Sequence, residues 1–554
     1  MDKYIGTNMQ EMGTRFSLML MPLHDVYFAA AGDFDPIKHG DKTVVYIFLS
    51  IAVLILLIAC INFMNLSTIR AVERSKEVGL RKMMGALRNN LIWQFIGESI
   101  LLTLVSCLLS VGLLLLLMPS YNQLLGYTLS VSWNSLPIYA FLAAVILIVG
   151  FLAGSYPAFF LSSFSPIESL KGKLRLGKGG SFFRQTLVVV QFAISVFLII
   201  GTIVIAKQMS YVKNKQLGYN QDQTVVVPID NGDIYQHMYT FKNELQNKGN
   251  VASVSLMSGE PGGFFDDFTF EVEGQRDVWK ARTEFADFEI VKTLGLKVIA
   301  GRNFSPAYAT DSSDAVLINR TAAAKLGFTP EQALGKWIRN PFRDSLRRRI
   351  IGVVEDFNFL SLKENMDALV IAPNEDRRVA VIRLKPGNIQ AGLATIKNEY
   401  QKVAPVYPFE YSFLDQKFDQ LYKADIRQQN IITIFSALAI FIACLGLFGL
   451  ASFTAAKRIK EIGVRKVLGS STENIVMLLS KDLLKPVLLA AIIAIPVAYY
   501  AMHNWLENFA YRTPLQWWIF VVAALITVAI ALITVSIKAV RAAIANPVDS
   551  LRTE

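Results

Sequence analysis

The chain has 554 residues, of which 53% are hydrophobic and only 18% charged, and its mean hydropathy is +0.39. This composition excludes an ordinary soluble protein and indicates a membrane protein. The net charge of +11 does not indicate nucleic-acid binding, because the basic residues form short clusters beside apolar runs instead of alternating with aromatic residues on one face. Cys60, Cys107 and Cys444 lie inside apolar runs, which excludes a disulfide framework or a zinc site.

Seven apolar runs are long enough to cross a bilayer as helices, since a span needs about 20 residues. The first four predicted spans are Val44–Leu66, Leu91–Met118, Leu136–Leu161 and Gln185–Ala206. The last three are Ile431–Phe453, Leu484–Met502 and Leu515–Ile537. We therefore expect a polytopic α-helical membrane protein with about seven transmembrane helices.

Lysine and arginine at the helix ends predict the orientation of the spans, because cytoplasmic segments are enriched in these residues. Basic clusters follow the first, third and fifth spans, around residues 70–88, 171–184 and 457–466, and Lys538 and Arg541 open a cytoplasmic tail. The segment 118–137 has no charged residue, which is typical of an external loop. The long stretch between the fourth and fifth spans is then also external.

This orientation places residues 1–43 outside, yet MDKYIGTNMQEMGTRF lacks the features of a signal peptide. Two interpretations stay open: an upstream helix is missing from this sequence, or a short N-terminal tail crosses the membrane unaided. We expect residues 1–43 to be the C-terminal remnant of a first external domain.

One short basic segment occurs twice, as RSKEVGLRKMMGA from Arg74 and RIKEIGVRKVLGS from Arg458. Glu77 aligns with Glu461, and Arg81 with Arg465, at a shift of 384 residues (461 minus 77). The match extends to the flanking spans, and after the third span of each half Pro166 aligns with Pro547 at a shift of 381 (547 minus 166). The chain is therefore an internal duplication in parallel orientation.

Each copy of the segment predicts a short amphipathic helix. The acid precedes the base by four residues in both, the favourable order on a helix, and Gly85 and Gly469 stand where a helix ends. Val78, Leu80 and Met83, or Ile462, Val464 and Val467, form the apolar side. A helix lying on the membrane surface explains one copy, whereas two matching copies favour a two-fold cytoplasmic partner.

The external stretch predicts an α+β domain. Strands are expected at Thr224–Val227, Val251–Leu256, Ala315–Ile318, Arg349–Val354 and Val379–Leu384, and helices at Gln236–Asn247, Thr321–Leu326 and Ile389–Val403. Asn319 and Asn388 are expected N-caps, and Gly327 is an expected helix stop. The adjacent acids Asp266 and Asp267, or Glu355 and Asp356, are poor catalytic pairs, because neighbouring side chains in a strand point to opposite faces.

No phosphate-binding loop of the form GxxxxGK[ST] occurs, so the sequence predicts no ATPase activity in this chain. The segment KGKLRLGKGG, Lys171 to Gly180, is rich in glycine and lysine without that spacing, and a cytoplasmic linker is the favoured interpretation. Gly150 with Gly154, and Gly446 with Gly449, offer small faces for helix packing.

The repeated motif resembles the signature of FtsX/MacB/LolC-type permeases, the membrane subunits of type VII ABC transporters. Tyr156-Pro157-Ala158-Phe159, Phe183-Arg184-Gln185 and the external run Ile351 to Phe357 are similar to the tandem subfamily with two fused halves. The resemblance implies duplicated FtsX-like units of three helices and a MacB-like periplasmic domain in a bacterial inner membrane. It also implies that the N-terminal helix and most of the first periplasmic domain are lacking.

By this resemblance, the duplicated segments are coupling helices that contact a dimeric cytoplasmic ABC ATPase, which holds ATP and Mg while this chain binds no cofactor. The implied contact residues are Glu77, Gly79, Arg81, Lys82 and Gly85, with Glu461, Gly463, Arg465, Lys466 and Gly469. Further expected partners are membrane lipid and a periplasmic adaptor or outer-membrane component. Two functions stay open: export of hydrophobic or peptide-like cargo, and an FtsX-like scaffold that switches a periplasmic partner such as a cell-wall hydrolase.

The expected organisation follows from these interpretations. It runs 1–43, remnant of a first periplasmic domain; 44–161, first three-helix unit; 162–184, cytoplasmic linker; 185–207, helix opening the second half; 208–428, periplasmic α+β domain; 429–538, second three-helix unit; and 539–554, cytoplasmic tail.

Overall fold

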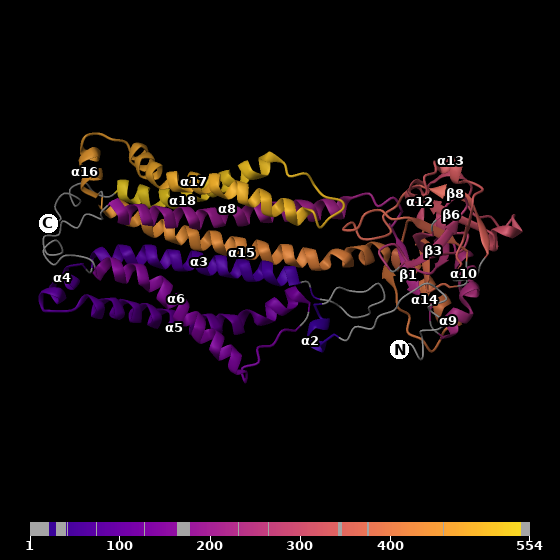
Figure 1. Cartoon of the computed structure of the whole chain (residues 1–554), viewed down its shortest axis with the longest axis horizontal. Coiled ribbons are helices and arrows are strands. Elements are labelled where there is room, and N and C mark those ends of the chain that lie inside the picture. Colours follow the sequence, from indigo (N-terminus) through magenta and orange to yellow (C-terminus); the bar gives the residue numbers. More distant parts are fainter. Residues whose placement is uncertain are drawn as a thin grey trace.

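The computed structural model describes residues 21–28, 40, 42–73, 75–126, 128–162, 178–230, 232–263, 265–276, 278–341, 346–373, 376–457 and 459–544. Most of the expected N-terminal remnant, linker residues 163–177 and tail residues 545–554 therefore lie outside the described residues. Figure 1 shows a long helical bundle at one end and an α+β domain at the other.

The bundle is built from helices whose apolar composition suits the interior of a bilayer. Its members are α3 (Lys42–Glu73), α5 (Arg88–Leu125), α6 (Leu136–Ser162), α8 (Lys178–Asn214), α15 (Leu414–Lys457), α17 (Thr472–Leu506) and α18 (Trp517–Ile544). Among the described residues, seven helices are long and apolar enough to cross a membrane, which confirms the predicted number of spans. The short helices α4 (Ser75–Met83) and α16 (Ile459–Val467) follow α3 and α15, and α2 (Leu23–Val26) precedes them.

The two halves of the bundle differ in packing. In the second half, a fourth helix, α8, packs against α17. In the second half, Val196, Ile199 and Ile200 of α8 are buried together with Ala491 and Ala494 of α17. The residues of α5 at the equivalent positions, 384 earlier, are Cys107 and Ser110, and they line an open groove of about 580 Å³ between α3, α5 and α6. The duplication is therefore asymmetric in its packing.

The α+β domain contains two sheets. The four-stranded sheet has the order β11-β1-β10-β2 and is antiparallel throughout. Its strands are β1 (Thr224–Pro228), β2 (Val251–Met257), β10 (Val379–Leu384) and β11 (Ser412–Phe413). Both faces are buried: Val225 and Val227 pack toward α9 (Gly232–Gln236), α10 (Met238–Gln246) and α14 (Ile389–Val403), and Val226 packs toward the second sheet.

The second sheet has the order β5-β8-β6-β9-β4-β3-β7, and an additional β7–β8 pairing closes six of these strands into a ring. Its strands are β3 (Asp266–Val272), β4 (Trp279–Phe285), β5 (Val298–Gly301), β6 (Ala315–Asn319), β7 (Trp337–Arg339), β8 (Arg347–Val354) and β9 (Leu369–Ala372). Its short helices are α11 (Ile290–Leu294), η2 (Ala309–Ser312), α12 (Arg320–Lys325) and α13 (Pro330–Ala333). Alternate residues such as Phe285, Ile318 and Val370 form a separate core within this sheet.

Most of the local predictions for this domain are confirmed. The expected strands correspond to β1, β2, β6, β8 and β10, and α14 has the expected bounds. The expected helix at Gln236–Asn247 is wrong at its start, because His237 has a non-helical backbone that separates α9 from α10. Asn319 and Asn388 cap α12 and α14 by accepting hydrogen bonds from Ala322 N and Ala391 N, and Gly327 has a φ of +77° after α12.

Candidate functional site

The first copy of the repeated segment forms α4, which includes Glu77, Gly79, Arg81 and Lys82. One hydrophobic residue of this helix, Val78, is 2% exposed and packs with Leu91 and Phe95 of α5. This contact attaches α4 to the start of the transmembrane helix that follows it.

Arg81 connects α4 to α5 through a row of polar side chains. Its guanidinium pairs with Glu77, with Nη2 and Oε1 2.7 Å apart, and Nη1 donates to Gln94 Oε1 at 2.9 Å. Gln94 Nε2 in turn donates to Glu98 Oε1 at 3.2 Å. All these groups are exposed, so each pair contributes little to stability, but together they orient the arginine.

Lys82 connects α4 to the end of α6. Its ammonium donates to the carbonyl oxygen of Ser162 at 2.7 Å, and Arg88 Nε donates to the Ser162 hydroxyl at 3.4 Å. Partial burial lowers the pKa of Lys82, and the neighbouring charge of Arg88 adds to this effect. Arg81 and Lys82 therefore link α4 to both α5 and α6.

The second copy forms α16, which includes Glu461, Gly463, Arg465 and Lys466. Arg465 pairs with Glu461 at 2.9 Å, as Arg81 does with Glu77. Ile462, the counterpart of Val78, is 4% exposed. The two copies therefore share their internal ion pair and their single anchoring residue.

Gly85 and Gly469 end the two helices in the same way. Gly85 N donates to Lys82 O and Ala86 N donates to Arg81 O, while Gly469 N donates to Lys466 O and Ser470 N to Arg465 O. This is the Schellman pattern, which requires a left-handed residue, and the two glycines have φ values of +92° and +86°. The predicted helix stops are confirmed.

Only part of the apolar side predicted for each helix is buried. Val78 and Ile462 are buried, whereas Leu80 and Met83 in the first copy, and Val464 and Val467 in the second, are exposed. Met84 and Leu468, just before the glycines, are 81% and 79% exposed. This last pair lies outside the predicted apolar side, although both copies have a large apolar residue there. Each copy thus presents a small apolar surface that no described residue covers.

Figure 1 places α4 and α16 at the same end of the bundle, away from the α+β domain. The two matching surfaces therefore face the same side of the membrane.

The four packing glycines lie where helices approach closely. A Cβ atom at Gly150 would lie 2.8 Å from Ile100 Cα, and one at Gly154 would lie 2.7 Å from Ser99 Cβ. At Gly446 it would meet Asn62 Oδ1 at 2.6 Å, and at Gly449 it would clash with the Leu66 side chain. The first two glycines pack α6 against α5, and the other two pack α15 of the second half against α3 of the first.

Helix α15 joins the bundle to the α+β domain. Its first turns bury Leu414, Phe418 and Tyr422 in the core that the two sheets share. Lys417 Nζ pairs with Glu260 Oε1 at 2.6 Å, and Tyr422 Oη accepts from Leu362 N at 2.6 Å. One uninterrupted helix therefore extends from this domain to Lys457, two residues before the start of α16.

Comparison with known families matches most of the chain. The profile of the FtsX-like permease C-terminal region matches residues 49–166 and again 433–547, and that of the MacB-like periplasmic core domain matches residues 187–398. The two FtsX-like matches each contain one copy of the repeated segment. The chain belongs to the FtsX/MacB-like ABC permeases. It is a multi-pass inner-membrane protein, and its α+β domain is periplasmic.

Individual relatives of this permease match over shorter stretches. The macrolide export ATP-binding/permease protein MacB of Bdellovibrio bacteriovorus is 35% identical over 131 residues, which are 24% of this chain and 20% of the relative. The uncharacterized ABC transporter permease YknZ of Bacillus subtilis is 31% identical over 125 residues, 22% of this chain and 30% of the relative. The match thus spans less than a third of either relative.

Among solved structures, the periplasmic region of MacB from Actinobacillus actinomycetemcomitans matches 36% of this permease and 93% of that chain. The sequence identity is 16% and the TM-score is 0.28.

Three of the four acidic residues considered in the periplasmic domain have structural partners. Glu355 pairs with Lys297 at 3.1 Å and with Arg320 at 3.0 Å, whereas Asp356 accepts from the backbone N and the hydroxyl of Thr321, both at 2.9 Å. Asp266 lies 3.5 Å from Arg378. The neighbouring acids Glu355 and Asp356 thus turn to different partners instead of converging on a substrate.

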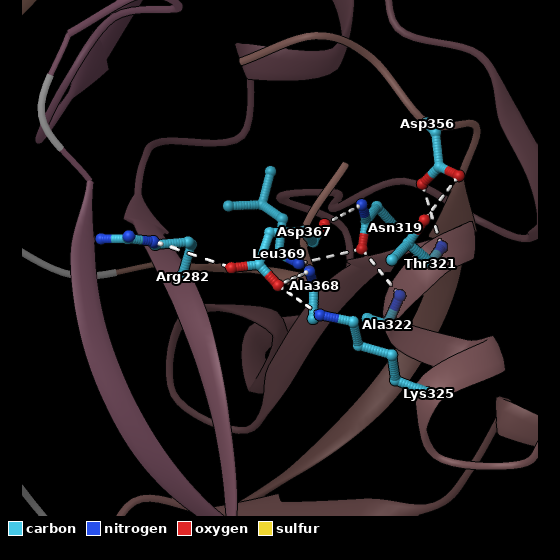
Figure 2. A network of polar contacts seen from close by, with 9 residues as sticks. All are labelled: Arg282, Asn319, Thr321, Ala322, Lys325, Asp356, Asp367, Ala368 and Leu369. Carbon is cyan, nitrogen blue, oxygen red and sulfur yellow. Dashed lines mark hydrogen bonds and ion pairs between the residues drawn. The ribbon is translucent and has the colours of Figure 1, made fainter. Parts of the chain in front are cut away.

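Figure 2 shows how these contacts stabilise the start of α12. Asn319 Oδ1 accepts from Ala322 N and from Leu369 N, both at 2.9 Å, and its amide donates to Asp367 O at 2.9 Å. Asp367 in turn pairs with Lys325 at 2.5 Å and lies 3.8 Å from Arg282. The network joins β6, β9 and α12 of the permease and has the features of a structural support. No group of potential metal ligands occurs among the described residues.

Proposed function

We propose that this chain is the membrane subunit of an ABC transporter and couples ATP hydrolysis by a separate cytoplasmic ATPase to movement of its periplasmic domain. The observation that carries the proposal is the pair of matching helices α4 and α16, each with one anchoring residue and an exposed apolar surface. A dimeric ATPase has two equivalent grooves, so a duplicated docking helix fits it.

In this proposal, Glu77, Gly79, Arg81, Lys82 and Gly85 contact one ATPase subunit, and Glu461, Gly463, Arg465, Lys466 and Gly469 contact the other. ATP and Mg are bound by the ATPase, and this chain catalyses no reaction itself. Contacts of α4 with α5 and α6 pass movement into the first half. In the second half, α15 ends at Lys457, two residues before α16 begins, and its first turns pack in the periplasmic domain.

We further propose that the cargo is hydrophobic or peptide-like and is exported with the help of a periplasmic adaptor or outer-membrane component. The export function in the names of the MacB relatives supports this choice over the FtsX-like signalling scaffold. A scaffold would instead co-purify with a periplasmic hydrolase and with no adaptor.

The ATPase contacts are tested with the tagged 554-residue chain purified from its native membrane. We expect charge reversal at Arg81 and Arg465 together to reduce recovery of the ATPase at least tenfold. Because Arg81 also contacts Glu77 and Gln94, a second variant, Met84→Asp with Leu468→Asp, tests the exposed apolar surface without breaking an internal contact.

The matched control replaces only one copy, as in Met84→Asp alone, and should retain intermediate recovery. Full recovery of the ATPase with both double variants would exclude these helices as its docking site.

A further inference from the structure

A groove of about 750 Å³ lies between α17 and α18 of the second half. Its apolar lining is formed by Val476, Met477, Leu484 and Leu488 of α17 with Leu532 and Val540 of α18. The polar residues that line it are Glu473, Ser480, Lys481, Lys485 and Ser536. An elongated apolar groove with a few polar groups suits a long amphipathic molecule.

The two glycines that pack α6 closely on α5 in the first half have no counterpart in the second half. At the shift of 381 residues, Ala531 and Val535 stand in place of Gly150 and Gly154. In the first half, a Cβ atom at Gly150 or Gly154 would lie within 3.4 Å of Ile96, Ser99 or Ile100 of α5, so these glycines permit close packing of α6 on α5. In the second half, Ala531 and Val535 are buried in a core that α18 shares with α8, α15 and α17.

Two lysines of the groove have no counterpart in the first half. Lys481 and Lys485 replace Gly97 and Leu101 at the shift of 384, and their spacing of four places them on one side of α17. Both are exposed, and neither forms an ion pair with another described residue. Glu473 lies about two turns before Lys481, in the first turn of α17. Asp482 belongs to the same turn, and its side chain lies outside the described residues.

Ser480 provides an independent indication of a ligand. Its side chain is 4% exposed, and its hydroxyl has no hydrogen-bond partner among the described residues. Serine in a transmembrane helix usually donates to the carbonyl four residues earlier, as Ser99 does to Phe95 at 2.9 Å. A buried hydroxyl without a partner is costly unless a ligand supplies one.

The depth of the groove fits the cytoplasmic leaflet. The apolar span of α17 begins at Leu484 and that of α18 ends at Ile537. Lys481 and Lys485 lie on either side of this boundary, where we expect the lipid phosphates, and Leu488 and Leu532 lie further into the apolar span. Lysine side chains at this depth extend toward the headgroups.

We infer that this groove binds an anionic phospholipid of the cytoplasmic leaflet. Lys481 and Lys485 bind the phosphate, Ser480 donates a hydrogen bond to a headgroup or ester oxygen, and an acyl chain occupies the apolar lining. Basic pockets between transmembrane helices on the cytoplasmic side are typical sites for such lipids. The groove begins near the start of α17, the helix that follows α16 in the chain.

The test uses the purified 554-residue chain in detergent with phosphatidylglycerol or phosphatidylcholine added, and counts bound lipids by native mass spectrometry. We expect phosphatidylglycerol to be retained preferentially. Lys481→Ala with Lys485→Ala should reduce its retention roughly 25-fold, because each lysine near an anionic surface contributes about a factor of five.

A second variant tests the shape of the groove. Ser536→Trp fills it from α18 and should reduce retention of phosphatidylglycerol without changing the charge. The matched control, Lys385→Ala with Lys397→Ala, removes two exposed lysines from the periplasmic domain and should retain the lipid fully. Thermal unfolding and gel filtration check that each variant is folded.

Two results would overturn the inference. One is equal retention of phosphatidylcholine and phosphatidylglycerol by the unaltered chain. The other is unchanged retention of phosphatidylglycerol when both lysines are replaced.

Discussion

Glu284 of β4 is a carboxyl group buried in the periplasmic domain, with polar contacts on one side only. Its Oε1 accepts from Ser258 N at 2.9 Å, from Ser258 Oγ at 3.1 Å and from Gly259 N at 3.2 Å. Its Oε2 has no partner among the described residues. Burial raises the pKa of Glu284 well above its usual range, against the effect of these hydrogen bonds, and the nearby Glu260 adds to the rise.

This raised pKa predicts how the stability of the periplasmic domain depends on pH. The folded state holds the Glu284 proton more tightly than the unfolded state, so the stabilisation is complete below the unfolded pKa of about 4.3 and is lost as pH rises toward the folded value. Glu284→Gln keeps an oxygen acceptor and cannot ionise. We expect the variant to show a weaker loss of stability between pH 5 and pH 8, measured by hydrogen exchange of β2 and β4 amides.

Asp311, which Arg302 contacts through two hydrogen bonds of 2.5 and 2.7 Å, provides the control for this experiment. The ion pair lowers the pKa of Asp311, so Asp311→Asn should alter the pH dependence only in the acidic range. A Glu284→Gln variant with the same slope as the unaltered chain would show that Glu284 is ionised in the folded state.

At the scale of helices, close packing of α5 against α6 depends on the absence of a side chain at Gly150. A Cβ atom there would lie 2.8 Å from Ile100 Cα, a backbone atom that can move only with its helix. We expect Gly150→Ala to destabilise the bundle by about 1–3 kcal/mol, the usual cost of overpacking. The measurement is thermal or denaturant-induced unfolding in detergent.

Gly112 of α5 is a matched control, because nothing lies within 4 Å of a Cβ atom built at this residue. Gly112→Ala should be neutral or should stabilise the helix by up to about 1 kcal/mol, the helix propensity gained over glycine. Equal effects of the two substitutions would contradict the close approach of α5 and α6.

The helices also show how much of the structure local sequence can predict. Hydropathy identified all seven spans, because a bilayer imposes a minimum length of apolar residues. It placed the start of the fifth span at Ile431, whereas α15 begins at Leu414. The additional turns are amphipathic, with Leu414, Phe418 and Tyr422 on one side, and pack on a domain whose position the sequence did not provide.

The sequence likewise predicted some contacts of the candidate site and not others. The ion pairs and terminal glycines of α4 and α16 are interactions within a few residues, so the spacing predicted them. The bonds from Arg81 to Gln94 and from Lys82 to Ser162 join different helices, and no local pattern indicates them. The groove beside Lys481 is lined by two helices, α17 and α18, so it can be recognised only in the folded structure.

At the scale of the whole molecule, the parallel duplication puts α4 and α16 on one side of the membrane and the α+β domain on the other. We expect a cysteine at Lys82 or Lys466, in a chain without Cys60, Cys107 and Cys444, to be protected from a membrane-impermeant thiol reagent in intact cells. A cysteine at the exposed Lys385 of the periplasmic domain should react.

Permeabilised cells are the control for this labelling, because all three cysteines should react there. Labelling of Lys82→Cys but not Lys466→Cys in cells whose outer membrane alone is permeable would show an inverted repeat and contradict the two-fold docking surface.

Helix α15 has 44 residues and is therefore about 66 Å long. Its first turns pack in the core of the periplasmic domain and it ends at Lys457, two residues before α16, so one continuous helix joins this domain to the cytoplasmic end of the bundle. A tilt of only about 5° would displace one end relative to the other by about 6 Å, a full helical turn. If α15 transmits the proposed coupling, a tilt of this size moves its periplasmic end far enough to change which surfaces the α+β domain presents.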